Sequence, residues 1–242
     1  RTLVRLSFSR KKSRLVLLNN DDLQTFKRES LAPFNNIRLI RGAGVDCNRF
    51  TPEGKSTSTG RLSVLLPSRI LWDKGLAEYI EAARTLKEKR NIDFFIAGSP
   101  DVGNPASVPA QVVNSWVSEG LVTWLGHVED MPALYRSMDV VALPSYREGL
   151  PTSLTEAAAS GCALITTDAP GCREVVKDGV DGLLIPVRDG KALATAITKL
   201  DDDRSLLRRL GSAARAKALA EFDEKIVIAR ALAVYDGLQA SA

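Results

Sequence analysis

The stretch that decides the fold is Pro144-Ser-Tyr-Arg-Glu-Gly-Leu-Pro-Thr-Ser-Leu-Thr-Glu156. It follows the apolar run Asp139-Val-Val-Ala-Leu143 and leads into Ala157-Ala-Ala-Ser-Gly161. This pattern predicts a buried strand, a tight loop and a short helix that ends at a glycine. Backbone N–H groups from about Leu150 to Leu154 would then point out of the helix start, together with the positive end of the helix dipole.

Such a helix start favours phosphate, and two carboxylates flank it, those of Glu148 and Glu156. Carboxylates accept hydrogen bonds from sugar hydroxyls, and Gly149 allows the backbone to approach a ligand closely. A diphosphate with a sugar at each end is a nucleotide-sugar. Glu156 also has a structural interpretation, because Ser153-Leu-Thr-Glu156 matches a capping box in which the glutamate bonds the first amide of the helix.

The composition is that of an ordinary globular chain. Its 242 residues are 45% hydrophobic and 26% charged, and no apolar run approaches the roughly 18 residues of a membrane span. The three cysteines, Cys47, Cys162 and Cys172, lack CxxC spacing, and His127 is the only histidine. We therefore expect buried thiols, a cytoplasmic location and no zinc site.

Charge is distributed unevenly along the chain. Residues 1–50 hold eleven Lys and Arg against four Asp and Glu, whereas the remaining residues hold 22 against 25. A nucleic-acid-binding protein would be basic throughout its binding domain, so we expect no nucleic-acid partner. The densest cluster, Arg10-Lys-Lys-Ser-Arg14, is interpreted either as contact with an anionic membrane surface or as a solvated connecting segment. The chain begins at Arg1 rather than Met, which suggests a partial or processed chain.

Apolar segments alternate with helical patterns from residue 62 onward. Leu76, Tyr79, Ile80, Ala83 and Leu86 share one helical stripe. Each strand-to-helix unit fits a right-handed crossover, so we predict the α/β class, with a Rossmann-like, doubly wound parallel sheet. The predicted strands of this sheet are 62–66, 92–97, 121–125, 140–143, 163–166 and 183–185. Two short strands, near residues 15–18 and 37–40, precede a polar linker at 51–60.

In such sheets ligands bind beyond the carboxyl ends of the strands. Arg69 and Lys74 follow the first strand of the sheet and could neutralise a diphosphate without a metal, or they could be two surface cations. His127 follows the third strand, where a general base and a structural histidine are both open interpretations. The backbone around Val128 could face a nucleobase.

With these loops in place, the chain resembles the C-terminal half of a retaining GT-B glycosyltransferase of family four, the glycosyl transferases group 1. Glu148-Gly-Leu-Pro-Thr-Ser-Leu-Thr-Glu156 fits the E-x7-E motif of that family. The blocks Gly171-Cys-Arg-Glu-Val-Val-Lys-Asp-Gly179 and Asp181-Gly-Leu-Leu-Ile-Pro186 fit the motifs that follow it. Upstream, Gly44-Val-Asp-Cys-Asn-Arg-Phe50 fits as well, so the resemblance covers nearly the whole chain.

The resemblance implies a role for each matching residue. Arg69, Lys74 and Glu148 are the expected catalytic residues, the two cations on the donor diphosphate and the glutamate on the transferred sugar. Glu156 is expected to bind the ribose hydroxyls. The remaining expected donor-binding residues are Gly149, Leu150, Pro151, Thr152 and Ser153 on the phosphate or sugar, and Val128 and Asp130 on the base.

The resemblance also implies how the chain is divided. Residues 1–42 would be the end of an N-terminal domain and the interdomain crossing, residues 43–224 the nucleotide-sugar domain, and residues 225–242 a helix that returns toward the first domain. The acceptor would bind to that N-terminal domain, so this chain alone would bind donor without turnover. Apolar residues facing the absent domain, such as Ile226, Leu232 and Tyr235, would be exposed and could drive dimerisation.

The expected reaction transfers a sugar, with retention, from a nucleoside diphosphate to an acceptor hydroxyl. We expect a UDP-sugar donor, a carbohydrate or lipid-linked glycan acceptor, a role in bacterial surface polysaccharide or lipopolysaccharide synthesis, and peripheral contact with the inner membrane face. Asp201-Asp-Asp203 is interpreted as a helix-start charge run, so no metal or other cofactor is expected. A non-hydrolysing nucleotide-sugar epimerase of the same architecture remains an alternative. The motifs of dinucleotide-dependent dehydrogenases and P-loop NTPases are absent from the sequence.

Overall fold

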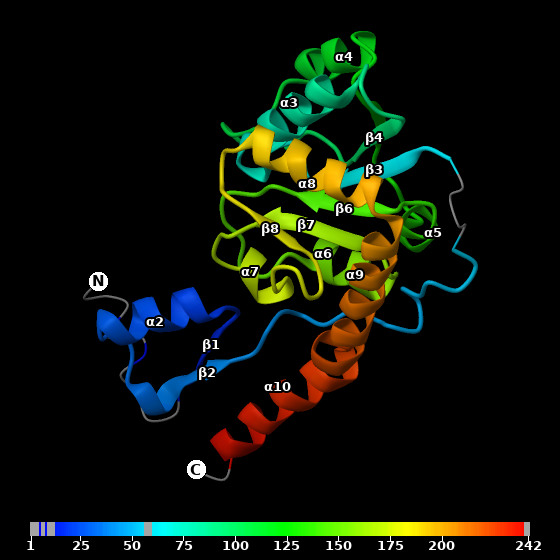
Figure 1. The fold of residues 1–242 in the computed structure, drawn as a ribbon. Helices are drawn as coiled ribbons and strands as arrows, with labels where there is room; N and C mark the ends of the chain where they lie inside the picture. Colours follow the sequence, from blue (N-terminus) through cyan, green and yellow to red (C-terminus); the bar gives the residue numbers. More distant parts are fainter. Residues whose placement is uncertain (1–4, 6–7, 9–12, 56–59, 240–242) are drawn as a thin grey trace.

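Six parallel strands form the central sheet of the chain (Figure 1). The structure is a computed structural model that describes residues 5, 8, 13–55 and 60–239. The strands are β3 (Leu62–Pro67), β4 (Ile92–Ala97), β5 (Thr123–Gly126), β6 (Val140–Leu143), β7 (Ala163–Thr167) and β8 (Leu183–Ile185). Their order in the sheet is β5-β4-β3-β6-β7-β8, and every pair is parallel. This order is that of a doubly wound sheet, the class predicted from the alternation of strands and helices.

Helices cover both faces of this sheet. On one face lie α3 (Leu76–Leu86), α4 (Ala110–Ser118) and α8 (Gly190–Asp202), and on the other α5 (Met131–Arg136), α6 (Thr152–Ala159) and α7 (Cys172–Val175). Helix α9 (Arg204–Lys217) reaches from one core cluster to the other, with Leu210 in the first and Ala214 in the second. The inner part of the sheet is therefore buried on both sides, and β6 and β7 are buried along their whole length, whereas the edge strand β5 is partly exposed.

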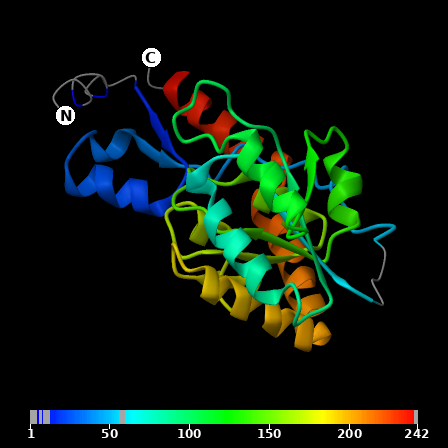
Figure 2. The same ribbon diagram turned by 90° about the horizontal axis from the view of Figure 1, so that it is seen from above.

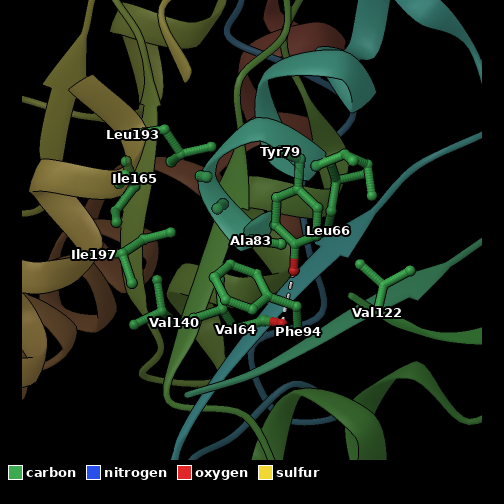
Figure 3. Packing of buried hydrophobic residues seen from close by; sticks show 14 of the residues in the cluster. Val64, Leu66, Tyr79, Ala83, Phe94, Val122, Val140, Ile165, Leu193 and Ile197 are labelled. Carbon is green, nitrogen blue, oxygen red and sulfur yellow. Dashed lines mark hydrogen bonds between the residues drawn. The ribbon is translucent and has the colours of Figure 1, made fainter. Parts of the chain in front are cut away.

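The alternation of side chains along β3 divides the core into two clusters. Val64 and Leu66 face α3 and α8, whereas Leu65 faces the cluster that contains α6. In the first cluster, shown in Figure 3, Tyr79 lies on the buried stripe of α3, and its hydroxyl donates to the carbonyl of Val64 at 2.8 Å. All five residues of the predicted stripe on α3 are buried, which confirms that prediction.

The N-terminal segment forms a separate unit. Strands β1 (Leu15–Leu17) and β2 (Ile37–Leu39) pair in parallel and are joined through α2 (Asn20–Arg28). The side chain of Asn19 caps α2 and accepts a hydrogen bond from the amide of Asp22. Most of the basic cluster at 10–14 lies outside the described residues.

The C-terminal helix α10 (Glu224–Gln239) follows α9 after a π-helical segment at Ala218–Phe222. It leaves the sheet and runs toward the side on which β1 and β2 lie (Figures 1 and 2). Leu232 and Tyr235 are exposed, as predicted, whereas Ile226 is only partly exposed. No helix in the described part of the chain combines the length and the apolar composition needed to cross a membrane.

Candidate functional site

The strands β3 and β6 are parallel neighbours, so their carboxyl ends lie side by side. The strand order of the sheet reverses between these two strands. In doubly wound sheets such a reversal opens a crevice in which ligands bind. The loop after β3 ends at Gly75, whose φ is +77° and which starts α3. A Cβ atom at this position would overlap the carbonyl oxygen of Pro144, the first residue after β6. Glycine therefore allows the two loops to touch.

This contact places Lys74 beside Glu148. The Nζ atom of Lys74 lies 2.6 Å from Oε1 of Glu148, and the two side chains are only 15% and 13% exposed. Lys74 is thus a half-buried member of the crevice, which excludes the interpretation of this residue as a plain surface cation. An ammonium group in contact with a carboxylate in a crevice can bind a phosphate oxygen when a ligand rearranges the pair.

A hollow of about 400 Å³ opens at the same edge of the sheet, at the carboxyl ends of β3, β4 and β5. Among the described residues its lining includes Arg69 and Glu156 but neither Lys74 nor Glu148. The predicted residues that line it are Arg69, Val128, Ser153 and Glu156, and they are joined by Ser68, Ser99, Asp101, His127 and Tyr135. The structure therefore brings together Arg69, Val128 and the start of α6 with Glu156, which the sequence had placed after three different strands.

Arg69 extends over the hollow from the loop after β3. Its side chain is 63% exposed, and Nη1 lies 2.5 Å from Oδ2 of Asp101, which follows β4. The same carboxylate oxygen accepts from Nδ2 of Asn104 at 3.0 Å. One edge of the guanidinium is thus held by Asp101, and the planar group retains further N–H donors for a ligand.

Glu156 projects from α6 into the hollow. Burial raises the pKa of its carboxyl group, and a hydrogen bond from Tyr135 and the charge of Arg49 partly oppose this effect. The hydroxyl of Tyr135 donates to Oε2 of Glu156 at 3.2 Å. The capping-box interpretation of Glu156 is wrong, because the cap of α6 is Pro151 and no side chain bonds the first amides.

Helix α6 starts at Thr152, within the stretch 150–154 from which the sequence predicted outward-pointing amides. The amide of Leu154 donates to the carbonyl of Pro151 at 3.1 Å, so this N–H is not available to a ligand as predicted. The structure, as far as it describes the chain, gives no acceptor for the amides of Gly149, Leu150, Thr152 and Ser153. These donors, with the helix dipole behind them, remain suited to an anion.

The loop after β5 contributes Val128 and His127 to the hollow. His127 is exposed, which argues against a structural histidine packed in the core. The carboxylate of Asp130 caps α5, because Oδ1 accepts from the amide of Ala133 at 3.0 Å. The side chain of Asp130 therefore already has a structural role, and its predicted contact with a base stays a prediction.

The N-terminal unit also contacts this region. Asn19 is fully buried, and its Nδ2 donates to the carbonyl of Gly149 at 2.9 Å. Asp22 forms an ion pair with Arg147, and Nε of Arg41 lies 2.6 Å from Oε2 of Glu174. The loop that carries Glu148 is therefore held from the N-terminal unit as well as from the sheet.

Nothing in the described part of the chain gathers three His, Cys, Asp or Glu side chains as a metal site requires. Cys47, Cys162 and Cys172 are buried free thiols, as predicted. Asp203 caps α9, and Asp201 and Asp202 form ion pairs with Arg90. The acidic run is thus explained by helix ends and ion pairs, which agrees with the interpretation of it as a charge run.

Three residues of this region were missed by the sequence analysis, namely Asn19, Asp101 and Tyr135. Asp101 lies in a loop rich in proline and glycine, and Tyr135 reads as one apolar residue of a short helix. A side chain that supports another residue across 21 or 130 positions of sequence leaves no local pattern. Only the presence of Asp101 directly after a strand end could have drawn notice.

Comparison with known proteins identifies relatives of this architecture. Residues 50–217 match the family described as glycosyl transferases group 1. The chain is 33% identical to the N,N'-diacetylbacillosaminyl-diphospho-undecaprenol alpha-1,3-N-acetylgalactosaminyltransferase of Campylobacter jejuni, over 97% of this chain and 63% of that protein. It is 28% identical to the UDP-Gal:alpha-D-GlcNAc-diphosphoundecaprenol alpha-1,3-galactosyltransferase of Escherichia coli, over 80% of this chain and 52% of that protein.

Solved structures share the fold. A glycosyltransferase from Rickettsia africae matches with a TM-score of 0.84 at 20% identity, over 96% of this chain and 65% of that one. Anabaena HepE in complex with UDP and glucose matches with a TM-score of 0.78 at 23% identity, over 91% of this chain and 63% of that one. The chain thus spans less than two thirds of the length of each of these four proteins.

Proposed function

The chain belongs to the glycosyl transferases group 1 family, and from this premise we propose that it is the donor-binding part of a glycosyltransferase. The whole glycosyltransferase would transfer a sugar from a nucleoside diphosphate to an acceptor hydroxyl, with retention of the configuration at the anomeric carbon. The epimerase alternative gains nothing from the relatives described above, since both curated proteins are named as sugar transferases.

One observation carries this proposal: the hollow of about 400 Å³ places Arg69, Glu156 and the start of α6 around one space. A diphosphate lying across the start of α6 would meet the amides of Thr152 and Ser153 and the guanidinium of Arg69. A ribose next to it would reach the carboxylate of Glu156. Val128, on the far side of the hollow, leaves room for a base to lie against the backbone of its loop.

Lys74 and Glu148 would act beside this hollow, at the junction of diphosphate and transferred sugar. The ammonium of Lys74 would move part of its interaction from Glu148 to the leaving phosphate as negative charge develops there. Glu148 would then accept a hydroxyl of the transferred sugar, while Gly149 and Leu150 offer backbone amides to it. The departing phosphate would take the proton of the acceptor hydroxyl.

We further propose that this chemistry needs no metal ion and no other cofactor. Arg69, Lys74 and the dipole of α6 together supply the positive charge that a bound cation would otherwise provide. Donor binding in the presence of a chelator tests this part of the proposal directly.

Residues 1–42 would complete a first domain, of which the parallel pair β1–β2 is a part, and α10 would return to it. The acceptor would bind between that domain and the sheet, so this chain alone would bind donor and show no turnover. UDP-sugars and lipid-linked glycan acceptors are proposed from the names of the relatives, as is a role in the synthesis of bacterial surface polysaccharides at the inner membrane face.

Calorimetric titration of the chain with UDP, GDP and ADP, in buffer containing EDTA, tests the proposal. One nucleotide should bind, and Arg69→Ala and Glu156→Ala should each weaken it by about 1–3 kcal/mol, the range for unpairing a charged hydrogen bond. Arg84→Ala is the matched control, since Arg84 pairs with Glu119 on the surface of α3, away from the hollow. Absence of binding by the folded chain would contradict the proposal.

A further inference from the structure

The carboxylate of Glu156 is oriented by a residue from another helix. Tyr135 lies on α5, is fully buried, and donates its hydroxyl proton to Oε2 of Glu156 at 3.2 Å. Burial, followed by the neighbouring charge of Glu156, raises the pKa of Tyr135 far above its usual value. The hydroxyl therefore keeps its proton and acts only as a donor toward this carboxylate.

Tyr135 is itself held from two sides. Its ring packs at a tilt against Phe50, with 6.1 Å between the ring centroids. Its carbonyl accepts a hydrogen bond from the Sγ atom of Cys162 at 3.2 Å, directly before β7. Because these contacts fix both the ring and the backbone, the hydroxyl has one position available, and that position meets Glu156 at the edge of the hollow.

A carboxylate with one oxygen bound in this way presents the other in a defined direction. Without the hydroxyl of Tyr135, the half-buried Glu156 would lose a donor that offsets its burial, and its side chain could turn among several rotamers. Helix α5 is capped by Asp130, two residues after Val128, which lines the same hollow. One short helix therefore links the loop proposed to hold the base with the carboxylate proposed to hold the ribose.

We propose that Tyr135 is a positioning residue for donor binding, an inference that rests on the proposed function. Tyr135 fixes Glu156 so that the free oxygen of this carboxylate accepts hydrogen bonds from the ribose hydroxyls of the nucleotide. The partner recognised through this pair is the cis-diol of a nucleoside diphosphate. The hydroxyl of Tyr135 is hydrogen-bonded to Glu156, so its influence on ribose binding passes through that carboxylate.

The test is a cycle of two ligands and four variants. UDP and 2′,3′-dideoxy-UDP are titrated calorimetrically into the wild-type chain, Tyr135→Phe, Glu156→Gln, the double variant of these two and the matched control Tyr79→Phe. Tyr79 is also a fully buried tyrosine whose hydroxyl bonds backbone carbonyls, but it lies on the opposite face of the sheet. Thermal unfolding of each variant confirms that it is folded before titration.

Tyr135→Phe should weaken UDP binding by about tenfold, which corresponds to roughly 1.4 kcal/mol. Its affinity for the dideoxy nucleotide should stay within about twofold of wild type, because the carboxylate then has no hydroxyl to bind. Tyr79→Phe should leave both affinities within about twofold, although it costs stability. In a Glu156→Gln background, Tyr135→Phe should have little further effect.

Equal losses for UDP and dideoxy-UDP in Tyr135→Phe would overturn the inference, because they would show a general disturbance of the fold. Unchanged UDP binding in Tyr135→Phe, with a loss in Glu156→Gln, would overturn it as well while leaving the proposed function intact. If the wild-type chain binds no UDP, GDP or ADP, the proposed function fails first and the inference fails with it. The three outcomes are therefore distinguishable.

Discussion

The ion pair of Lys74 and Glu148 should contribute far more to folding than the surface pairs of this chain. Its atoms are 2.6 Å apart, and its side chains are 15% and 13% exposed. At an effective dielectric constant of 20 the attraction alone is about 6 kcal/mol, most of which is offset by the loss of water around both charges. Removal of one partner, however, leaves the other charge in the crevice without compensation.

We therefore expect Lys74→Met to lower the free energy of unfolding by about 3 kcal/mol, the low end of the range for buried pairs, because some solvent still reaches the site. Glu148→Gln should cost a similar amount. The double variant should cost less than the two together, with a coupling energy of about 1–3 kcal/mol. Urea unfolding followed by the fluorescence of Trp72, Trp116 and Trp124 measures all three.

The pair of Arg84 and Glu119 is the matched control, with side chains 56% and 46% exposed. Arg84→Met should cost less than about 1 kcal/mol, as exposed ion pairs do. If Lys74→Met costs no more than Arg84→Met, or if the cycle shows no coupling, the reasoning from burial is refuted. The pair would then be one of several interchangeable arrangements and not a fixed part of the crevice.

Three further predictions concern the remaining parts of the site and its surroundings. Burial raises the pKa of Glu156 in the native state. The native state therefore binds this proton more readily than the unfolded state. As a consequence, the free energy of unfolding of the wild type should fall as the pH rises from about 4.5 through the raised pKa. Glu156→Gln should lose this dependence and melt at a higher temperature than wild type near pH 7, and equal melting temperatures at pH 7 would contradict the prediction. Gly75→Ala should cost about 2 kcal/mol or more in urea unfolding, because φ is +77° and the added Cβ would overlap Pro144; Gly103→Ala, with φ of +88° and open space around it, should cost less. If the chain dimerises through α10, Tyr235→Lys should return it to monomer in sedimentation velocity, since Tyr235 is 64% exposed beside Leu232 at 55%; an unchanged dimer would place the interface elsewhere.

The sheet was predictable because most residues of its strands are apolar and each strand ends in a loop of different composition. β4, β6 and β8 begin and end at the predicted residues, and β5 starts two residues later than predicted, at Thr123. Leu121 and Val122 are apolar because they pack in the core, and periodicity cannot separate core packing from strand pairing. The parallel, doubly wound arrangement of the strands was predicted from the general rule that crossovers are right-handed.

The sequence predicted those site residues that lie in a loop or helix start directly after a strand of the sheet. It did not predict residues that support the site from a distant part of the chain. Arg69, Glu156 and Val128 meet in one hollow because their strands end at the same edge of the sheet. The capping box failed for a local reason, since the N-cap of the helix is Pro151 and not Ser153. Tyr135 and Asn19 support the site across long stretches of sequence, so their roles follow from packing and not from a motif.

Both cations of the site already have carboxylate partners, and this has a consequence for the order of events. Arg69 is paired with Asp101 and Lys74 with Glu148, so the diphosphate of the proposed donor would meet cations that already have carboxylate partners. Arg69 is largely exposed and can bind a phosphate oxygen while Asp101 keeps its other edge. Lys74 is a point charge in a crevice and must weaken its contact with Glu148 to interact with the diphosphate. Glu148 then becomes free to accept a sugar hydroxyl, so diphosphate binding and sugar recognition should be coupled through this one lysine.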